Sequence, residues 1–246
     1  MEKRKKEQRK KDAEHKEEET IEKVSTKKLN RELLWVFGVM AGLIIIFLIS
    51  YSVFQSEKKF EYEGLKFTKE MFGEIPLYHY YYIGKVKTPT GVEQNKKVDI
   101  FLRNDPRENN VSIEGEIIFP LGKDVFVGVG DEGVTECDYS IIGIASLSSF
   151  LSQNGITAKG GSTDLEVSKA TELDYIACDK YPAHAVILIN GGEETHIKKT
   201  ADNCYEITVN NCETLPAIEK FIIQSVLDAK DRRIASGEYE SEVELK

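Results

Sequence analysis

The pattern of hydrophobic and polar positions sets one stretch of the chain apart from the rest. Residues 33–54 (LLWVFGVMAGLIIIFLISYSVF) contain no Asp, Glu, Lys, Arg or His. A helix rises about 1.5 Å per residue, so this run would be about 33 Å long and would cross a bilayer core of about 30 Å. Trp35 and Tyr51 lie near its two ends, where aromatic side chains meet lipid headgroups. We therefore predict a transmembrane helix over residues 33–54.

A cleaved signal peptide and a buried core helix both fit this run less well. A signal peptide has an apolar region of about 7–15 residues and a small-residue cleavage site, and this run is longer and lacks such a site. A core helix normally carries a polar stripe. The run is thus predicted to be an uncleaved signal anchor that contacts membrane lipid. Gly38 and Gly42 match the small-xxx-small spacing of close helix pairs, which allows a homodimer.

The charges on either side of the run predict its orientation. Residues 1–32 hold 12 Lys or Arg and 9 Asp or Glu, whereas residues 55–246 hold 21 basic and 33 acidic side chains. Basic flanks stay on the cytoplasmic side, so the N-terminus is predicted to be cytoplasmic and the C-terminal part extracytoplasmic. The charged tail 1–32 cannot fold alone, and its interleaved acids argue against nucleic acid as a partner.

The remaining residues alternate between strand-like and helix-like patterns. A polar linker is expected at 55–59, a domain at 60–231 with a sub-boundary near residue 135, and a disordered acidic tail at 232–246. Helical spacing covers residues 139–151 and 213–230. Period-two or β-branched runs predict strands at 60–64, 76–87, 97–102, 111–119, 125–129, 173–177, 185–189, 196–198 and 205–209. This order predicts an α+β domain with a mainly antiparallel sheet and two helices.

Two turns link predicted neighbours. The Thr-Pro-Thr-Gly turn at 88–91 suggests a hairpin between the second and third strands, and Asn190-Gly191-Gly192 suggests another between strands 185–189 and 196–198.

All four cysteines, Cys137, Cys178, Cys204 and Cys212, follow the apolar run. An even number on the predicted oxidising side indicates two disulfides. Free buried thiols and a zinc site are the alternatives, and no close pair of ligands supports zinc. Of the three pairings, we expect Cys137 with Cys178 and Cys204 with Cys212.

Three short motifs suggest sites. Residues 128–133 spell G-x-G-x-x-G, but two acids face the phosphate position and no acid follows about 20 residues later, so no cofactor is predicted. Arg103 and Arg107 flank Asp105 and could contact an anion, although a surface turn is the simpler interpretation. Asn110 begins an Asn-Val-Ser glycosylation acceptor.

Three further segments, residues 72–80 (FGEIPLYHY), 102–107 (LRNDPR) and 203–207 (NCYEI) with Cys212, show a resemblance. Together with the single span, the chain resembles an uncharacterised group of single-pass membrane proteins from small-genome archaea. The resemblance implies the architecture and an archaeal source, and no site residue.

We expect a membrane-anchored extracytoplasmic binding or scaffold protein, within a cell-envelope assembly, whose partner is an envelope protein or a glycan. No metal or catalytic motif favours an enzyme. The first alternative is a surface hydrolase that uses His184 or His196 with nearby carboxylates. The second is a subunit of a membrane complex held through Gly38 and Gly42.

Overall fold

The computed structural model describes residues 34–51, 58–87, 93–120 and 122–237. The chain forms two compact units, Met1–Lys58 and Lys59–Lys246. The predicted charged tail, both ends of the predicted span, residues 55–57 of the linker, the turn at 88–91 and the last nine residues lie outside the described residues.

The first unit contains one described helix, Leu34–Tyr51, which is long and apolar enough to cross a membrane. None of its 18-residue length is buried, and side chains such as Trp35 and Phe47 are exposed around it. Gly38 and Gly42 share one face, and nothing in the described chain lies within 4 Å of a Cβ added to either. A fully exposed apolar helix needs an apolar solvent, which is consistent with a membrane anchor.

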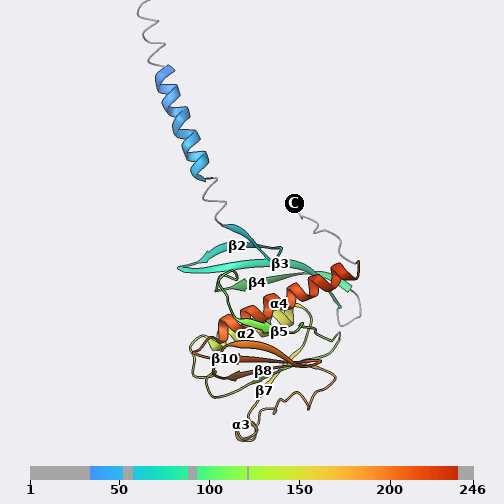
Figure 1. Ribbon diagram of the computed structural model, residues 1–246. Coiled ribbons are helices and arrows are strands. Elements are labelled where there is room, and N and C mark those ends of the chain that lie inside the picture. The colour runs from blue at the N-terminus through green and yellow to red at the C-terminus, as the bar shows by residue number, and fades with distance from the viewer. Residues whose placement is uncertain (1–33, 52–57, 88–92, 121, 238–246) are drawn as a thin grey trace, which may run out of the picture. The chain divides into compact units, whose positions relative to one another are not determined.

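The second unit, called the C-terminal domain below, begins with a small antiparallel sheet (Figure 1). Its strands follow the chain order β1-β2-β3-β4. Glu63 and Gly64 join the first two strands with positive φ at both positions, as a two-residue type I′ turn requires. The four strands are β1 Lys59–Tyr62, β2 Leu65–Phe72, β3 Ile75–Lys87 and β4 Glu93–Leu102.

The two faces of the small sheet differ because side chains alternate along each strand. Phe67, Tyr80 and Val98 point inward and are buried. His79, Tyr81 and Phe101 belong to the opposite, outer face. The antiparallel pairing agrees with the predicted fold class, although the sequence pattern did not predict β2.

A large mixed sheet follows, in the order β5-β9-β10-β8-β6-β7. Four of its five strand pairings are parallel and only β9–β10 is antiparallel, so the expectation of a mainly antiparallel sheet holds for the small sheet alone. The predicted hairpin at Asn190 is wrong, because β10 lies between β8 and β9. The strands are β5 Ser112–Glu114, β6 Val125–Val129, β7 Ala158–Ser162, β8 Ala185–Gly191, β9 His196–Ala201 and β10 Cys204–Val209.

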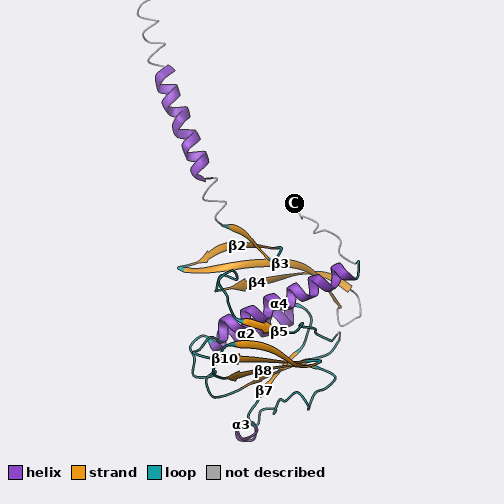
Figure 2. Cartoon of the chain, in the orientation of Figure 1, coloured by secondary structure: helices purple, strands orange, loops and turns teal. Residues whose placement is uncertain are grey.

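Two long helices lie between the sheets (Figure 2). Helix α2, Ser140–Gln153, connects the parallel strands β6 and β7, which makes a βαβ unit. Helix α4, Thr214–Ala235, lies beside it, and the Ser140 hydroxyl donates to Thr214 Oγ1 (2.7 Å). Because α4 continues to Ala235, the predicted tail from residue 232 starts too early.

One cluster of buried side chains includes residues of both sheets and both long helices. The C-terminal domain is therefore one compact unit without a division near residue 135. Tyr82 of the small sheet reaches the end of α2, where its hydroxyl donates to Asn154 Oδ1 (2.7 Å). Burial raises the pKa of Tyr82 to about 12.

A short helix, α3 Leu165–Thr171, lies between β7 and the next segment. Its N-cap residue Asp164 accepts hydrogen bonds from the backbone N–H groups of Glu166 and Val167. The strand predicted at 173–177 is reduced to one isolated bridge between Ser162 and Tyr175.

Candidate binding groove

The carboxyl ends of the parallel strands β6, β8 and β10 meet at one edge of the large sheet. Ligands of open α/β sheets bind outside such an edge, where neighbouring crossovers leave in different directions. The loops that start here contain Asp131 after β6, Glu193 after β8 and Asn210 after β10. Segments from distant parts of the chain therefore come together.

The G-x-G-x-x-G segment is part of this edge, and its glycines allow the chain to pack against itself. The Gly130 N–H donates to the carbonyl oxygen of Ile189 (2.7 Å), and a Cβ on Gly130 would lie 2.8 Å from Asn190 Oδ1. A Cβ on Gly191 would lie 2.5 Å from the Glu132 carbonyl oxygen. A Cβ on Gly128 would likewise lie 2.8 Å from Thr163 Cγ2, and Gly133 has a positive φ of 73°, so packing and backbone conformation require the three glycines of the segment.

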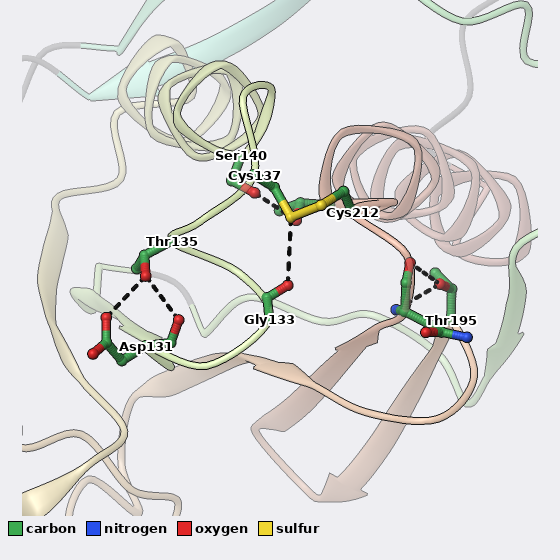
Figure 3. Close-up of a disulfide and its surroundings, with 9 residues drawn as sticks. Asp131, Gly133, Thr135, Cys137, Ser140, Thr195 and Cys212 are labelled. Atoms are coloured by element: carbon green, nitrogen blue, oxygen red, sulfur yellow. Dashed lines mark hydrogen bonds between the residues drawn. A yellow bond between two sulfur atoms is a disulfide. The ribbon is translucent and has the colours of Figure 1, made fainter.

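The loop after β6 closes on itself before it reaches α2 (Figure 3). Thr135 Oγ1 lies 2.7 Å from the carbonyl oxygen and 2.8 Å from a carboxylate oxygen of Asp131. No group of three His, Cys, Asp or Glu side chains within the described part of the chain is arranged to hold a metal ion.

Both predicted disulfides are present, but the preferred pairing is wrong. Cys137 bonds to Cys212 and Cys178 bonds to Cys204. Strand β10 starts at Cys204 and ends at Val209, about 16 Å away, so Cys212 follows the end of the strand opposite to Cys204. The first disulfide ties the loop after β6 to the residue preceding the N-cap of α4 (Figure 3).

A polar groove of about 540 Å³ lies beside this disulfide-linked segment. It is formed by the loop between β4 and β5, the loop after β8, and the segment from β10 into α4. Among the described residues that line it, five carry carboxylates and none is Lys or Arg. The lining residues are Asn104, Asp105, Glu108, Asn109, Asn110, Val111, Glu193, Glu194, Thr195, Asn210, Glu213 and Pro216.

A buried carboxylate holds the first of these loops against α4. Glu219 is only 3% exposed, and its carboxylate accepts hydrogen bonds from the backbone N–H groups of Arg103 and Asn104 and from Asn104 Nδ2. Burial raises the pKa of Glu219, and these three hydrogen bonds partly oppose the increase. Glu219 of α4 therefore fixes the position of the loop between β4 and β5.

Asp105 and Arg107 form a two-bond ion pair at the entrance to the same loop. Arg107 donates from Nε to Oδ1 (2.9 Å) and from Nη2 to Oδ2 (2.6 Å) of Asp105. These bonds lower the pKa of Asp105. The guanidinium also lies 4.0 Å from the centre of the Phe60 ring. The predicted anion contact stays a prediction, and neither Arg103 nor Arg107 lines the groove.

Amide side chains fix the other walls. Asn109 Nδ2 donates to the Pro216 carbonyl (2.8 Å). Asn210 donates two hydrogen bonds to the loop after β8, from its backbone N–H to Thr195 Oγ1 (2.9 Å) and from its Nδ2 to the Glu193 carbonyl (2.7 Å). Asn110 is exposed at the groove, so a glycan on this predicted acceptor would stand beside it.

The three histidines of the described chain do not line the groove, although His196 Nδ1 lies 3.1 Å from the carbonyl oxygen of the lining residue Glu194. His184 Nδ1 is 3.2 Å from the backbone oxygen of Asp124, and His196 Nε2 is 3.4 Å from Thr208 Oγ1. His79 bridges two carboxylates on the outer face of the small sheet, Glu70 (2.9 Å) and Asp99 (2.8 Å). None of them lines the polar groove or a second cavity of about 550 Å³ beside α2 and β7.

Comparison of this chain with protein families, curated proteins and solved structures finds no match. The resemblance to archaeal single-pass proteins therefore stays a prediction. The groove includes the acidic residues at 193, 194 and 213, which the sequence pattern did not indicate. No short motif marks them, because they meet only through the order of the strands.

Proposed function

We propose that this protein is a single-pass, membrane-anchored binding or scaffold protein with a cytoplasmic N-terminus and an extracytoplasmic C-terminal domain. The exposed apolar helix supports the anchor, and two disulfides are typical of an oxidising compartment. The excess of basic residues before the helix supports the orientation.

The polar groove is the proposed binding site, and its lining is the observation that carries the proposal. Carboxylates such as Glu193, Glu194 and Glu213 accept hydrogen bonds and favour positive charge. Glu213 follows the disulfide-bonded Cys212, and two hydrogen bonds of Asn210 hold the loop that contains Glu193 and Glu194, so little ordering is needed on binding. The proposed ligand is a Lys- or Arg-bearing segment of a cell-envelope protein.

Photo-crosslinking in intact cells tests this function. A photoreactive amino acid replaces Glu194 in the groove, and a matched one replaces Glu166, an exposed acid on α3. We expect a reproducible protein adduct from position 194 only. A glycan adduct would instead identify a sugar ligand, and equal labelling from both positions would contradict a specific groove.

Neutralisation of acidic residues distinguishes specific binding in the groove from a non-specific effect of the negative charge of the domain. With the photoreactive residue kept at position 194, the variant E193Q/E213Q should lower the yield of the adduct, because it removes two further exposed acids that line the groove. A control, E172Q/D174N, changes the net charge equally at exposed positions outside the groove and should leave the yield from position 194 unchanged. Protease protection of the C-terminal domain in intact cells would contradict the proposed orientation.

A second function, a subunit held in a membrane complex through its helix, is supported by the position of Gly38 and Gly42. Both lie on one face of a described helix with open space at their Cβ positions. Replacement of both by Ile should dissociate such a complex in mild detergent, as measured by size-exclusion chromatography.

A further inference from the structure

The β2–β3 hairpin ends in an apolar tip formed by Met71, Phe72 and Ile75. Their side chains are 62%, 74% and 40% exposed. None of them belongs to either cluster of buried residues in the described chain. Exposed apolar side chains that gather at one turn commonly mark a contact surface.

The tip projects beyond the rest of the small sheet (Figure 1). Strand β1 begins at Lys59, which pairs with Thr68, and β4 reaches only as far as Tyr78 on β3. The pairs from Glu70 to Phe72 on β2 therefore form a two-stranded ribbon with β3. At about 3.3 Å per residue, the two-stranded ribbon extends about 13 Å past the start of β1.

The direction of this extension is set by the antiparallel pairing of β1 with β2. Because β2 runs opposite to β1, it leaves the sheet on the side from which the chain enters β1. That chain comes from the apolar helix, which ends its described length at Tyr51. Eight residue steps separate Tyr51 from Lys59, so the chain between them spans at most about 29 Å.

We infer that the tip of the β2–β3 hairpin inserts into the same bilayer that the apolar helix crosses. This second lipid contact presupposes the proposed membrane anchor. A short tether holds the tip at an effective concentration in the millimolar range near its target, so a small apolar group suffices. Phe, Met and Ile side chains at a turn suit the boundary between headgroups and acyl chains.

The charged neighbours of the tip are compatible with this position. Glu70 is bonded to His79, and the Lys69 ammonium lies 5.7 Å from the Tyr78 ring centre. Glu74 is the charged residue of the turn itself, and it is exposed. The three charged side chains of residues 69, 70 and 74 remain at headgroup level while Phe72 enters the apolar layer.

Tryptophan fluorescence in vesicles tests the inference on the full-length chain. Trp35 is the single tryptophan, so Trp35→Phe gives a silent background. On this background, Phe72→Trp reports on the tip, and Ile141→Trp is a matched control because Ile141 is also 74% exposed but lies on α2. Both proteins are reconstituted in phosphatidylcholine vesicles with or without brominated acyl chains.

Brominated lipid should remove most of the emission of the F72W protein and leave that of the I141W protein unchanged, whereas aqueous iodide should quench only the I141W protein. Quenching of the F72W protein by iodide alone would overturn the inference. Protection of its indole from both quenchers would overturn the inference in favour of a protein partner.

Alkaline carbonate extraction of the same vesicles separates this inference from the proposed anchor. Release of the protein from the vesicles would overturn the anchor as well as the inserted tip. Retention of the protein, together with iodide quenching of the F72W emission, would overturn the inserted tip alone.

Discussion

The two sheets of the C-terminal domain are built and used differently. The small sheet joins strands that are neighbours in the sequence, and its outer face carries exposed aromatic side chains such as Tyr81 and Phe101. The large sheet joins distant strands, has two disulfides at its loops and presents a carboxylate-lined groove. Local pairing thus produces a face where aromatic rings stand among charged side chains such as Glu70 and Asp99, whereas non-local pairing collects polar groups from several loops at one edge.

Removal of the disulfides, which lie at the large sheet, should produce the largest loss of stability. Cys137 and Cys212 close a loop of 75 residues and Cys178 and Cys204 one of 26, so the chain-entropy relation predicts losses of about 4.5 and about 3.5 kcal/mol in the free energy of unfolding. The double variants C137S/C212S and C178S/C204S should be compared by urea denaturation. An equal loss from both would show that loop length does not govern the effect.

The two faces of the small sheet should respond unequally to the loss of an aromatic ring. Phe67 is 1% exposed and packs on Phe60 and Tyr80, so Phe67→Ala should cost about 4 kcal/mol. Phe101 is 47% exposed and stacks on His79, so Phe101→Ala should cost less than about 1 kcal/mol. Thermal unfolding of both variants measures the difference, and similar losses would mean that the outer face is covered.

Glu219 links the groove loop to the core and gives a smaller, pH-dependent effect. Glu219→Ala leaves the N–H groups of Arg103 and Asn104 without their acceptor, which should cost about 3 kcal/mol. The pKa of Glu219 is raised by burial above its usual 4.5, so the folded state binds this proton more tightly than the unfolded state. The stabilisation that comes from this tighter proton binding is fully present below pH 4.5, and it is lost as the pH rises through the raised pKa.

The free energy of unfolding of the wild type is compared with that of Glu219→Gln at each pH. All other groups titrate in both proteins, so the pH dependence of this difference reports the titration of Glu219. The unfolding free energy of wild type should fall relative to that of the variant as the pH increases above 4.5. Denaturation at a series of pH values measures the difference. A constant difference would show that the Glu219 carboxyl has the same pKa in both states.

The elements that carry their own periodic signal could be predicted from the sequence. Helices α2 and α4 have apolar side chains at helical spacing, and β3, β4, β8 and β10 are rich in apolar and β-branched residues. Strand β7 (AKGGS) has almost no such signal and is extended because it pairs with β6. Helix α3 was not predicted, although Asp164 is a recognisable N-cap for it.

The sequence by itself determined the apolar helix, the alternation of elements and the joining of all four cysteines, because these depend on composition and on local spacing. Only the tertiary structure decided which cysteines pair, which strands are parallel and which acids face one groove. Glu108, Glu194 and Glu213 are far apart along the chain, and they meet because strand order, unlike periodicity, is set by packing between segments distant in sequence.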